Sequence, residues 1–265
     1  MPRILDYTGQ DVDRTTTVGG IRAHRGSAPP MTQVTAGNAE EAAAAEAAGI
    51  DMVVCLSEAV PQVREGSTRL FVTAAIDFSG AVSDDELLGT AYKALTAGAD
   101  AVITARRLES LSRIAQEDIP VMGHLGFVPK KSTLYGGVRA IGKTADEAMD
   151  LIQQFDELEA AGAFAVECEL IPGSVMREIR KRTGMVTISL GSGADADVMF
   201  LFSSDICGES DRLPRHAQAW GDLASMKQQM HNARIDALTA YRNAVIDGTY
   251  PAQQHIATMD DQEHD

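Results

Sequence analysis

The chain has little of what a secreted, membrane-bound or nucleic-acid-binding protein needs. Its 265 residues contain only three cysteines, Cys55, Cys168 and Cys207, and their spacing matches no metal-binding or disulfide pattern. Positive charge is also scarce, because 23 Lys and Arg stand against 38 Asp and Glu, a formal net charge of −15. Such an acidic chain is poorly suited to non-specific binding of nucleic acid or anionic membranes. With no apolar signal-peptide core and no run approaching the roughly 18 apolar residues of a membrane span, we expect a cytoplasmic protein with reduced, buried cysteines.

A partial internal repeat organises the first two thirds of the chain. The segments AAGIDMVV, TAGADAVI and AAGAFAVE, at 47–54, 96–103 and 160–167, each join the end of an Ala-rich helix to an apolar run through a glycine. The glycine suits the left-handed position that ends a helix. The segments SDDE (83–86) and TADE (144–147) fit the capping box that begins one. The repeat therefore predicts alternating helices and strands.

Most of the apolar runs are short and unbroken rather than alternating, which is typical of parallel strands covered by helices on both faces. Eight such strands with intervening helices indicate an α/β fold, a (β/α)8 TIM barrel, with a doubly wound open sheet as the alternative. We expect one barrel domain over residues 1–265, with an N-terminal segment at 1–30, a last helix at about 222–247 and a polar C-terminal tail at 256–265. The predicted strands lie at 32–36, 51–56, 70–76, 100–105, 119–123, 164–170, 185–190 and 198–203.

Two glutamates interrupt the apolar segment AFAVECELIP at 163–172. Glu167 and Glu169 are two residues apart, so their side chains share one face of the predicted strand. In a barrel, functional side chains gather at the C-terminal ends of the strands. Charges facing the surrounding helices would instead be buried against apolar surfaces at a large free-energy cost. We therefore expect both carboxyl groups to point into the barrel mouth, with an ion pair to a neighbouring Lys or Arg as the alternative for each.

The segment VMGHLGFVPKKSTLYGG, at 121–137, ends one predicted strand and runs into a Gly-rich loop. This segment resembles the ketopantoate hydroxymethyltransferase family. The resemblance continues through LEAAGAFAVECELIP (158–172), TISLGSGADAD (187–197) and SSDICG (203–208), and returns in AYRNAVIDGTYPAQQH (240–255). It implies a TIM barrel of the phosphoenolpyruvate mutase and isocitrate lyase superfamily.

The resemblance also implies a reaction, a substrate and an assembly. In the family, a glutamate at the end of the sixth strand removes a proton from the carbon next to the keto group of a 2-oxoacid. The enolate then takes a hydroxymethyl group from 5,10-methylenetetrahydrofolate. By resemblance, Glu169 is this catalytic base and His124 is a substrate contact. The family further implies Mg²⁺ as the ion that holds the 2-oxoacid (3-methyl-2-oxobutanoate), a place in pantothenate biosynthesis, and a homo-oligomer, commonly a decamer.

The chain departs from the family at the metal site. The family carries carboxylates after the second, third and fourth strands. Here the segment VVCLSEAV places Ser57, or by a one-residue shift Leu56, at the first position. The segment AAIDF places Ala75 at the second. The segment VITARR places Ala105 at the third, and Ile103 where the family has a lysine. Because Mg²⁺ is usually held by one or two carboxylates, the sequence assigns no residue as a metal ligand.

Charged residues beside these positions leave two alternatives open. Arg106, or its neighbour Arg107, could hold a substrate carboxylate through a bidentate pair in place of the metal, or could be an exposed start to the next helix. Asp77 and Glu58 could instead rebuild a shifted metal site. We predict Ser57, Asp77 and Arg106 as substrate-binding residues together with the histidine.

Two classes of function stay open. The first is an enzyme of the family: either the hydroxymethyltransferase itself, or a divergent transferase or lyase that forms an enolate from another small carboxylate without Mg²⁺. The second is a non-catalytic barrel that binds a small carboxylate or serves as an assembly subunit. Glu169 and the GHLG loop favour the enzyme, because a scaffold has no need of a base at the barrel mouth.

Overall fold

The computed structural model describes residues 3–76 and 80–258. The chain divides into two compact units, one of residues 1–203 with 214–217 and the other of residues 204–213 with 218–265. The sequence predicts a single domain, whereas the division falls just after the last barrel strand. The first unit holds the barrel and every predicted site residue that the structure describes.

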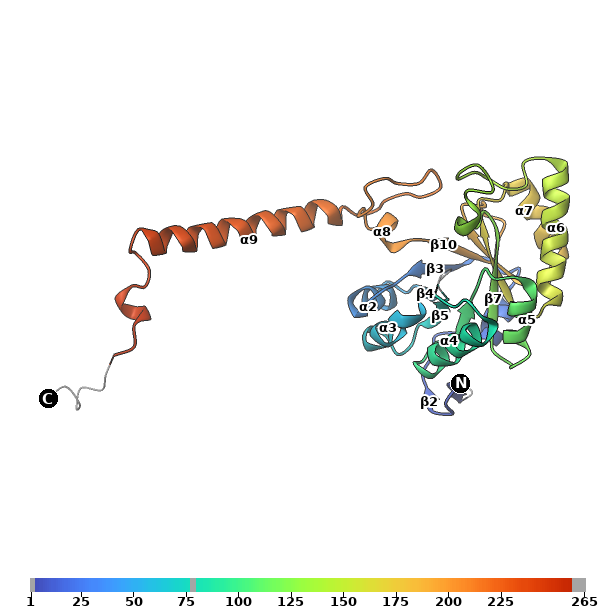
Figure 1. The fold of residues 1–265 in the computed structure, drawn as a ribbon, viewed down its shortest axis with the longest axis horizontal. Helices are drawn as coiled ribbons and strands as arrows, with labels where there is room; N and C mark the ends of the chain where they lie inside the picture. The colour runs from blue at the N-terminus through green and yellow to red at the C-terminus, as the bar shows by residue number, and fades with distance from the viewer. Residues whose placement is uncertain (1–2, 77–79, 259–265) are drawn as a thin grey trace. The chain divides into compact units, whose positions relative to one another are not determined.

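The first unit is built on a closed parallel barrel of eight strands (Figure 1). Each predicted strand is present, within a few residues of its expected bounds, so the barrel is confirmed and the open sheet is wrong. The order around the barrel is β10-β3-β4-β5-β6-β7-β8-β9, so that the chain's last strand closes onto its first. These strands are β3 (Met31–Thr35), β4 (Met52–Leu56), β5 (Phe71–Ala75), β6 (Ala101–Ile103), β7 (Val121–Gly126), β8 (Ala165–Glu169), β9 (Val186–Leu190) and β10 (Val198–Leu201).

Helices follow the strands and cover the outside of the barrel, as Figure 1 shows for α2 to α7. Several begin where the sequence predicts. Ser83 and Glu86 form the expected capping box, and Thr144 accepts a hydrogen bond from the backbone N–H of Glu147. The helices of this unit are α1 (Val18–His24), α2 (Ala39–Ala47), α3 (Val60–Gly66), α4 (Asp84–Thr96), α5 (Leu108–Ala115), α6 (Ala145–Ala160) and α7 (Gly173–Arg182), with short turns η1 (Ser57–Ala59) and η2 (Pro129–Lys131). Helix α8 (Ser203–Ile206) starts at the boundary between the two units.

An antiparallel pair, β1 (Ile4–Leu5) and β2 (Asp11–Val12), precedes the barrel and was not expected from the sequence. The segment that follows is tied to the barrel by a buried ion-pair network. Asp100, just before β6, accepts from Arg14 at 2.7 Å and from Arg64 at 2.6 Å. Because all three side chains are largely buried, removal of the shared carboxylate would leave two uncompensated charges.

Asp197, just before β10, is a second buried carboxylate and makes barrel stability depend on pH. It is 1% exposed and accepts from the backbone N–H of Gly26 at 2.8 Å and of Thr187 at 2.9 Å. Burial alone would raise its pKa, but these hydrogen bonds and the guanidinium of Arg180 outweigh it and lower the pKa. The stabilising contribution is therefore complete above the pKa of an unfolded aspartate and is lost as the pH falls through the lower, folded value.

We expect Asp197→Asn to lower the free energy of unfolding by about 1–3 kcal/mol at neutral pH, because the amide presents a donor to groups that are themselves donors. The difference in unfolding free energy between wild type and variant should become smaller as the pH is lowered below about 4, because the aspartate of the unfolded chain then takes up a proton. Urea unfolding at several pH values measures this. Asp195→Asn is the control, because the Asp195 side chain is 41% exposed and its ion pair with Arg177 lies at the surface. A difference in unfolding free energy that does not change with pH would contradict a stabilising role for ionised Asp197.

The second unit consists mainly of the long helix α9 (Leu223–Ile246), which confirms the predicted helix at about 222–247. Asp222 caps its start by accepting from the backbone N–H of Ser225. Beyond the helix, the ring of Tyr250 packs against those of Tyr241 and His255, the latter in the short turn η3 (Gln253–His255). Within the described residues of both units, no helix is both long and apolar enough to cross a bilayer.

Candidate active site

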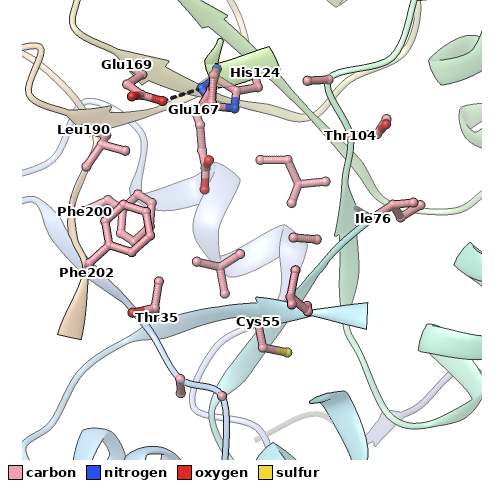
Figure 2. Close-up of a pocket in the computed structure, with 18 residues that line it drawn as sticks. Thr35, Cys55, Ile76, Thr104, His124, Glu167, Glu169, Leu190, Phe200 and Phe202 are labelled. Carbon is pink, nitrogen blue, oxygen red and sulfur yellow. Dashed lines mark hydrogen bonds and ion pairs between the residues drawn. The ribbon is translucent and has the colours of Figure 1, made fainter. Parts of the chain in front are cut away.

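A cavity of about 390 Å³ opens among the C-terminal ends of the barrel strands. Its walls are mostly apolar, and Figure 2 shows them converging on two glutamates and a histidine. The apolar lining comes from Val54, Leu56, Ala75, Ile76, Ile103, Leu190, Phe200 and Phe202, with Ala36, Ala105 and Pro129. Thr35, Cys55 and Thr104 add small polar or thiol groups. Burial raises the pKa of the Cys55 thiol to about 12, which keeps it protonated and unreactive at neutral pH.

Glu169 and His124 form a hydrogen-bonded pair at the rim of this cavity. Glu169 is the last residue of β8, and His124 lies on the neighbouring strand β7. His124 Nε2 is 3.0 Å from Glu169 Oε2, and the two side chains are only 9% and 13% exposed. Both side chains line the cavity (Figure 2), and so does Glu167, so the prediction that the two glutamates face the barrel mouth is confirmed.

The surroundings of the histidine of this pair favour its protonated form. Burial alone would lower its pKa, but the hydrogen bond with Glu169 and the neighbouring carboxyl groups outweigh burial and raise the pKa. His124 Nε2 then carries a hydrogen and donates it to the carboxylate. The pair therefore joins adjacent strands through one oxygen of Glu169 and leaves the second oxygen for a bound molecule.

Glu167 lies deeper in the barrel, on the same face of β8 and directly opposite His124 in the β7–β8 register. It is 6% exposed and lines the cavity. Gln33 Nε2 donates to Glu167 Oε1 at 3.0 Å, reaching it from β3, three strands away around the barrel. Burial in these apolar surroundings raises the pKa of Glu167, only partly offset by His124 and Gln33. Within residues 3–76 and 80–258, neither Glu167 nor Glu169 forms an ion pair with Lys or Arg, so that alternative is wrong for the described chain.

Ser57 and Arg106 are not among the residues that line this cavity, although Arg106 lines a second cavity that also includes His124. The guanidinium of Arg106 donates to the backbone carbonyls of Ala81 at 2.8 Å and Val82 at 2.7 Å, in the loop before α4. Arg107 pairs with Asp84 at 2.8 Å. Ser57 hydrogen-bonds the neighbouring Glu58 in η1 and is not among the lining residues.

Asp77 lies outside the described residues. The substrate-binding roles of Ser57, Asp77 and Arg106 therefore stay predictions, and the cavity as described holds neither Lys nor Arg in its lining.

The residues present do not fit the Mg²⁺ ion that the family resemblance implies. By the resemblance, Ser57 or Leu56, then Ala75 and Ala105, stand where the family has carboxylates. Leu56, Ala75 and Ala105 line the cavity with hydrocarbon side chains. Across the described part of the chain, no group of three or more His, Cys, Asp and Glu residues is placed to hold a metal ion. A hard cation needs anionic oxygens at such a site. We therefore derive the reaction at this site from the protein side chains and not from a bound cation.

Gln33 is the site residue that the sequence analysis missed. It is 1% exposed, and its Oε1 atom has no hydrogen-bond partner in the described chain. The signal was available, because Gln33 is a large amide inside the apolar strand MTQVT and an amide is rarely buried there without a partner. Its partner could not be found from the sequence, since Glu167 is 134 residues away.

The barrel and its rim define the class to which the chain belongs. 2,3-Dimethylmalate lyase, described as a member of the PEP mutase/isocitrate lyase superfamily, has a TM-score of 0.51 at 12% identity and covers 94% of this chain and 92% of its own. Phosphoenolpyruvate phosphomutase from Streptomyces platensis subsp. rosaceus gives 0.51 at 14% identity and 92% of both chains. At these identities the likeness concerns the fold alone, which is a TIM barrel.

Sequence similarity then identifies the family within this class. The family model for ketopantoate hydroxymethyltransferase matches residues 55–253. The 3-methyl-2-oxobutanoate hydroxymethyltransferase of Pyrobaculum islandicum is 32% identical over 197 residues, 73% of each chain. That of Chloroflexus aurantiacus is 30% identical over 270 residues, 92% of this chain and 93% of its own. The chain belongs to the ketopantoate hydroxymethyltransferase family.

Proposed function

We propose that this chain removes a proton from the carbon next to the keto group of a small 2-oxoacid, as the first half of a hydroxymethyl transfer, and that it does so without a divalent metal. The observation that carries this proposal is the pair of Glu169 and His124 at the rim of an apolar cavity. A carboxylate held by a neighbouring group and aimed into a pocket can act as a general base. Family membership supports the reaction class.

The chemistry assigns one role to each member of the pair. Glu169 accepts the proton of the substrate C–H bond, and the electrons of that bond move onto the carbonyl oxygen to give an enolate. His124 orients the carboxylate through its Nε2–H, 3.0 Å from Glu169 Oε2. The imidazolium also places positive charge beside the cavity in which negative charge develops, which lowers the energy of the enolate. The enolate carbon then attacks the formaldehyde equivalent that water releases from the donor. The new C–C bond forms as the electrons of the formaldehyde C=O bond move onto oxygen, which takes up a proton to give the hydroxymethyl group.

The cavity lining supports a substrate with a branched hydrocarbon end. Most of the lining is apolar, and 390 Å³ accommodates a molecule of a few carbon atoms. The curated relatives carry the name 3-methyl-2-oxobutanoate hydroxymethyltransferase, and this five-carbon acid is the substrate we propose. The donor 5,10-methylenetetrahydrofolate, the place in pantothenate biosynthesis and the homo-oligomer stay predictions from the family.

Deuterium uptake tests the proposal without needing the one-carbon donor. In D₂O, the protein should exchange the hydrogen on C3 of 3-methyl-2-oxobutanoate, followed by proton NMR. The matched control is 3,3-dimethyl-2-oxobutanoate, which has a similar shape and no hydrogen on that carbon. It should slow the exchange of the first compound by competing for the cavity. Absence of exchange would favour the alternative of a non-catalytic barrel.

Metal removal is expected to leave this exchange unchanged. Treatment with EDTA followed by desalting should keep the initial rate within about twofold of the untreated protein, and added Mg²⁺ should not raise it, because the lining offers hydrocarbon where a cation needs oxygen ligands. The metal content of the same samples is measured in parallel. Loss of exchange on chelation with recovery on addition of Mg²⁺ would show that a metal site forms after all.

A further inference from the structure

Glu167 has no part in the reaction as described so far, although it lies directly below the proposed base. It stands two residues before Glu169 on the same face of β8, and Figure 2 shows its side chain extending into the cavity. A buried carboxyl group without a cationic partner is costly, so its presence inside an apolar barrel needs a reason. Gln33 is buried with it and leaves one acceptor atom unpaired.

We propose that Glu167 is an uncharged carboxylic acid that donates a hydrogen bond to the carbonyl oxygen of the substrate and stabilises the enolate formed by Glu169. The inference rests on the proposed function and extends it. It names the group that stabilises the negative charge on the enolate oxygen, a role that a divalent cation would otherwise have. The C–H bond breaks, its proton goes to Glu169, its electrons move onto the carbonyl oxygen, and the Glu167 proton stays in the hydrogen bond to that oxygen.

The hydrogen bonds of the pair direct one oxygen of Glu167 toward the cavity. Gln33 Nε2 donates a hydrogen bond to Glu167 Oε1 at 3.0 Å, while Glu167 Oε2 has no partner in the described chain. Because Glu167 lines the cavity, Oε2 is the atom that can meet a bound molecule. The amide also fixes the orientation of the carboxyl group, since it reaches across the barrel interior from β3. A donor that is oriented before the substrate arrives is what stabilisation of a developing charge requires.

Burial of Glu167 favours its protonated form, and it outweighs the opposing effects of His124 and Gln33. The titratable groups that face it are His124 on β7, Glu169 on its own strand and the Cys55 thiol on β4, while Gln33 on β3 is uncharged. The imidazolium is already hydrogen-bonded to Glu169, whose negative charge repels a second carboxylate. Burial is the largest contribution and raises the pKa of Glu167.

The unpaired atom of Gln33 gives an independent reason for a proton at this position. Gln33 Oε1 is buried and lacks a donor in the described residues. An ionised Glu167 supplies only acceptors, so it cannot satisfy this atom. A carboxylic acid brings one donor into the pair. In the empty cavity this proton can be donated to Gln33 Oε1, whereas in the filled cavity the same proton is donated to the substrate oxygen and Gln33 Oε1 is again without a donor.

Two variants of Glu167 separate a neutral donor from a carboxylate. Glu167→Met removes the donor with little change in volume, and should lower the initial rate of deuterium uptake by about 10²–10³-fold. Glu167→Gln keeps an uncharged group that donates, and should stay within about tenfold of wild type. A loss as large for glutamine as for methionine would show that an ionised carboxylate is needed, and would overturn the inference. Equal rates for Glu167→Met and wild type would do the same.

A readout that does not depend on activity tests the protonation directly. At neutral pH the wild type should show the infrared carbonyl band of a protonated carboxylic acid, and the band should be missing from Glu167→Gln. Raising the pH should remove the band and slow exchange over the same pH range in the wild type, whereas Glu167→Gln should show only the smaller alkaline loss that comes from His124. Absence of the band at neutral pH overturns the inference even if exchange is fast. If the wild type shows the band but does not exchange, both the proposed function and the donor role of Glu167 are wrong. The uncharged state of Glu167 is then still supported by the band.

Discussion

Replacing Glu169 by glutamine is expected to lower the rate of deuterium uptake into 3-methyl-2-oxobutanoate by about 10²–10⁴-fold, the range that a positioned general base contributes. Glutamine has nearly the same volume and still accepts a hydrogen bond from His124, so the rim of the cavity should keep its shape. The loss comes from the missing proton acceptor alone. Initial rates measured by proton NMR at equal protein concentration test this.

Two controls accompany this variant. Glu58→Gln changes an exposed carboxylate in η1 and should leave the exchange rate within about twofold of wild type, because it is not part of the cavity lining. Thermal unfolding of Glu169→Gln should occur within a few degrees of wild type, which separates loss of the base from loss of the fold. Exchange by Glu169→Gln at the wild-type rate would remove this residue from the mechanism.

The second large effect is expected from Gly126→Ala. This substitution displaces the end of β8 and leaves the reacting groups themselves unchanged. Gly126 ends β7 with a φ of 86°, and a Cβ atom there would lie 2.2 Å from the carbonyl oxygen of Glu169. That oxygen accepts the backbone N–H of Phe127 at 2.8 Å, so it is fixed in the β7–β8 junction. The methyl group must push the end of β8 away.

We expect Gly126→Ala to cost roughly 2–5 kcal/mol of unfolding free energy, from the left-handed backbone and the overpacking together. Displacement of Glu169 by even about 1 Å should also slow exchange on the order of 10²-fold. Gly136→Ala is the matched control, because its φ is 72° but nothing lies within 4 Å of the added atom. It should lose only about 1–2 kcal/mol and keep the exchange rate. Equal effects from the two alanines would show that the contact with Glu169 is unimportant.

The barrel could be predicted because its signals are local. Each strand is a short apolar run, and the glycines that end the preceding helices do adopt left-handed conformations, with φ of 77° at Gly49, 106° at Gly98 and 101° at Gly162. The pair β1 and β2 could not be predicted in this way, since its strands have two residues each and carry no periodicity. The division into two units was also not visible, because composition does not change where the barrel ends.

Part of the site was predictable for the same reason. Glu169 and His124 stand at the ends of neighbouring predicted strands, and parallel strands bring their C-terminal ends together. Contacts that depend on side-chain reach were not predictable. The cross-barrel hydrogen bond of Gln33 to Glu167 requires the closed barrel. Arg106 turns to two backbone carbonyls in the loop before α4, and nothing in VITARR indicates where those carbonyls lie.

The central claim is that Glu169, at the rim of this barrel, removes a proton from a C–H bond without the help of a metal ion. The most direct measurement compares deuterium uptake into 3-methyl-2-oxobutanoate by EDTA-treated wild type and EDTA-treated Glu169→Gln, side by side. The account predicts exchange by the wild type at least about 10²-fold faster than by the variant. A chelated wild type that is no faster than Glu169→Gln would contradict it.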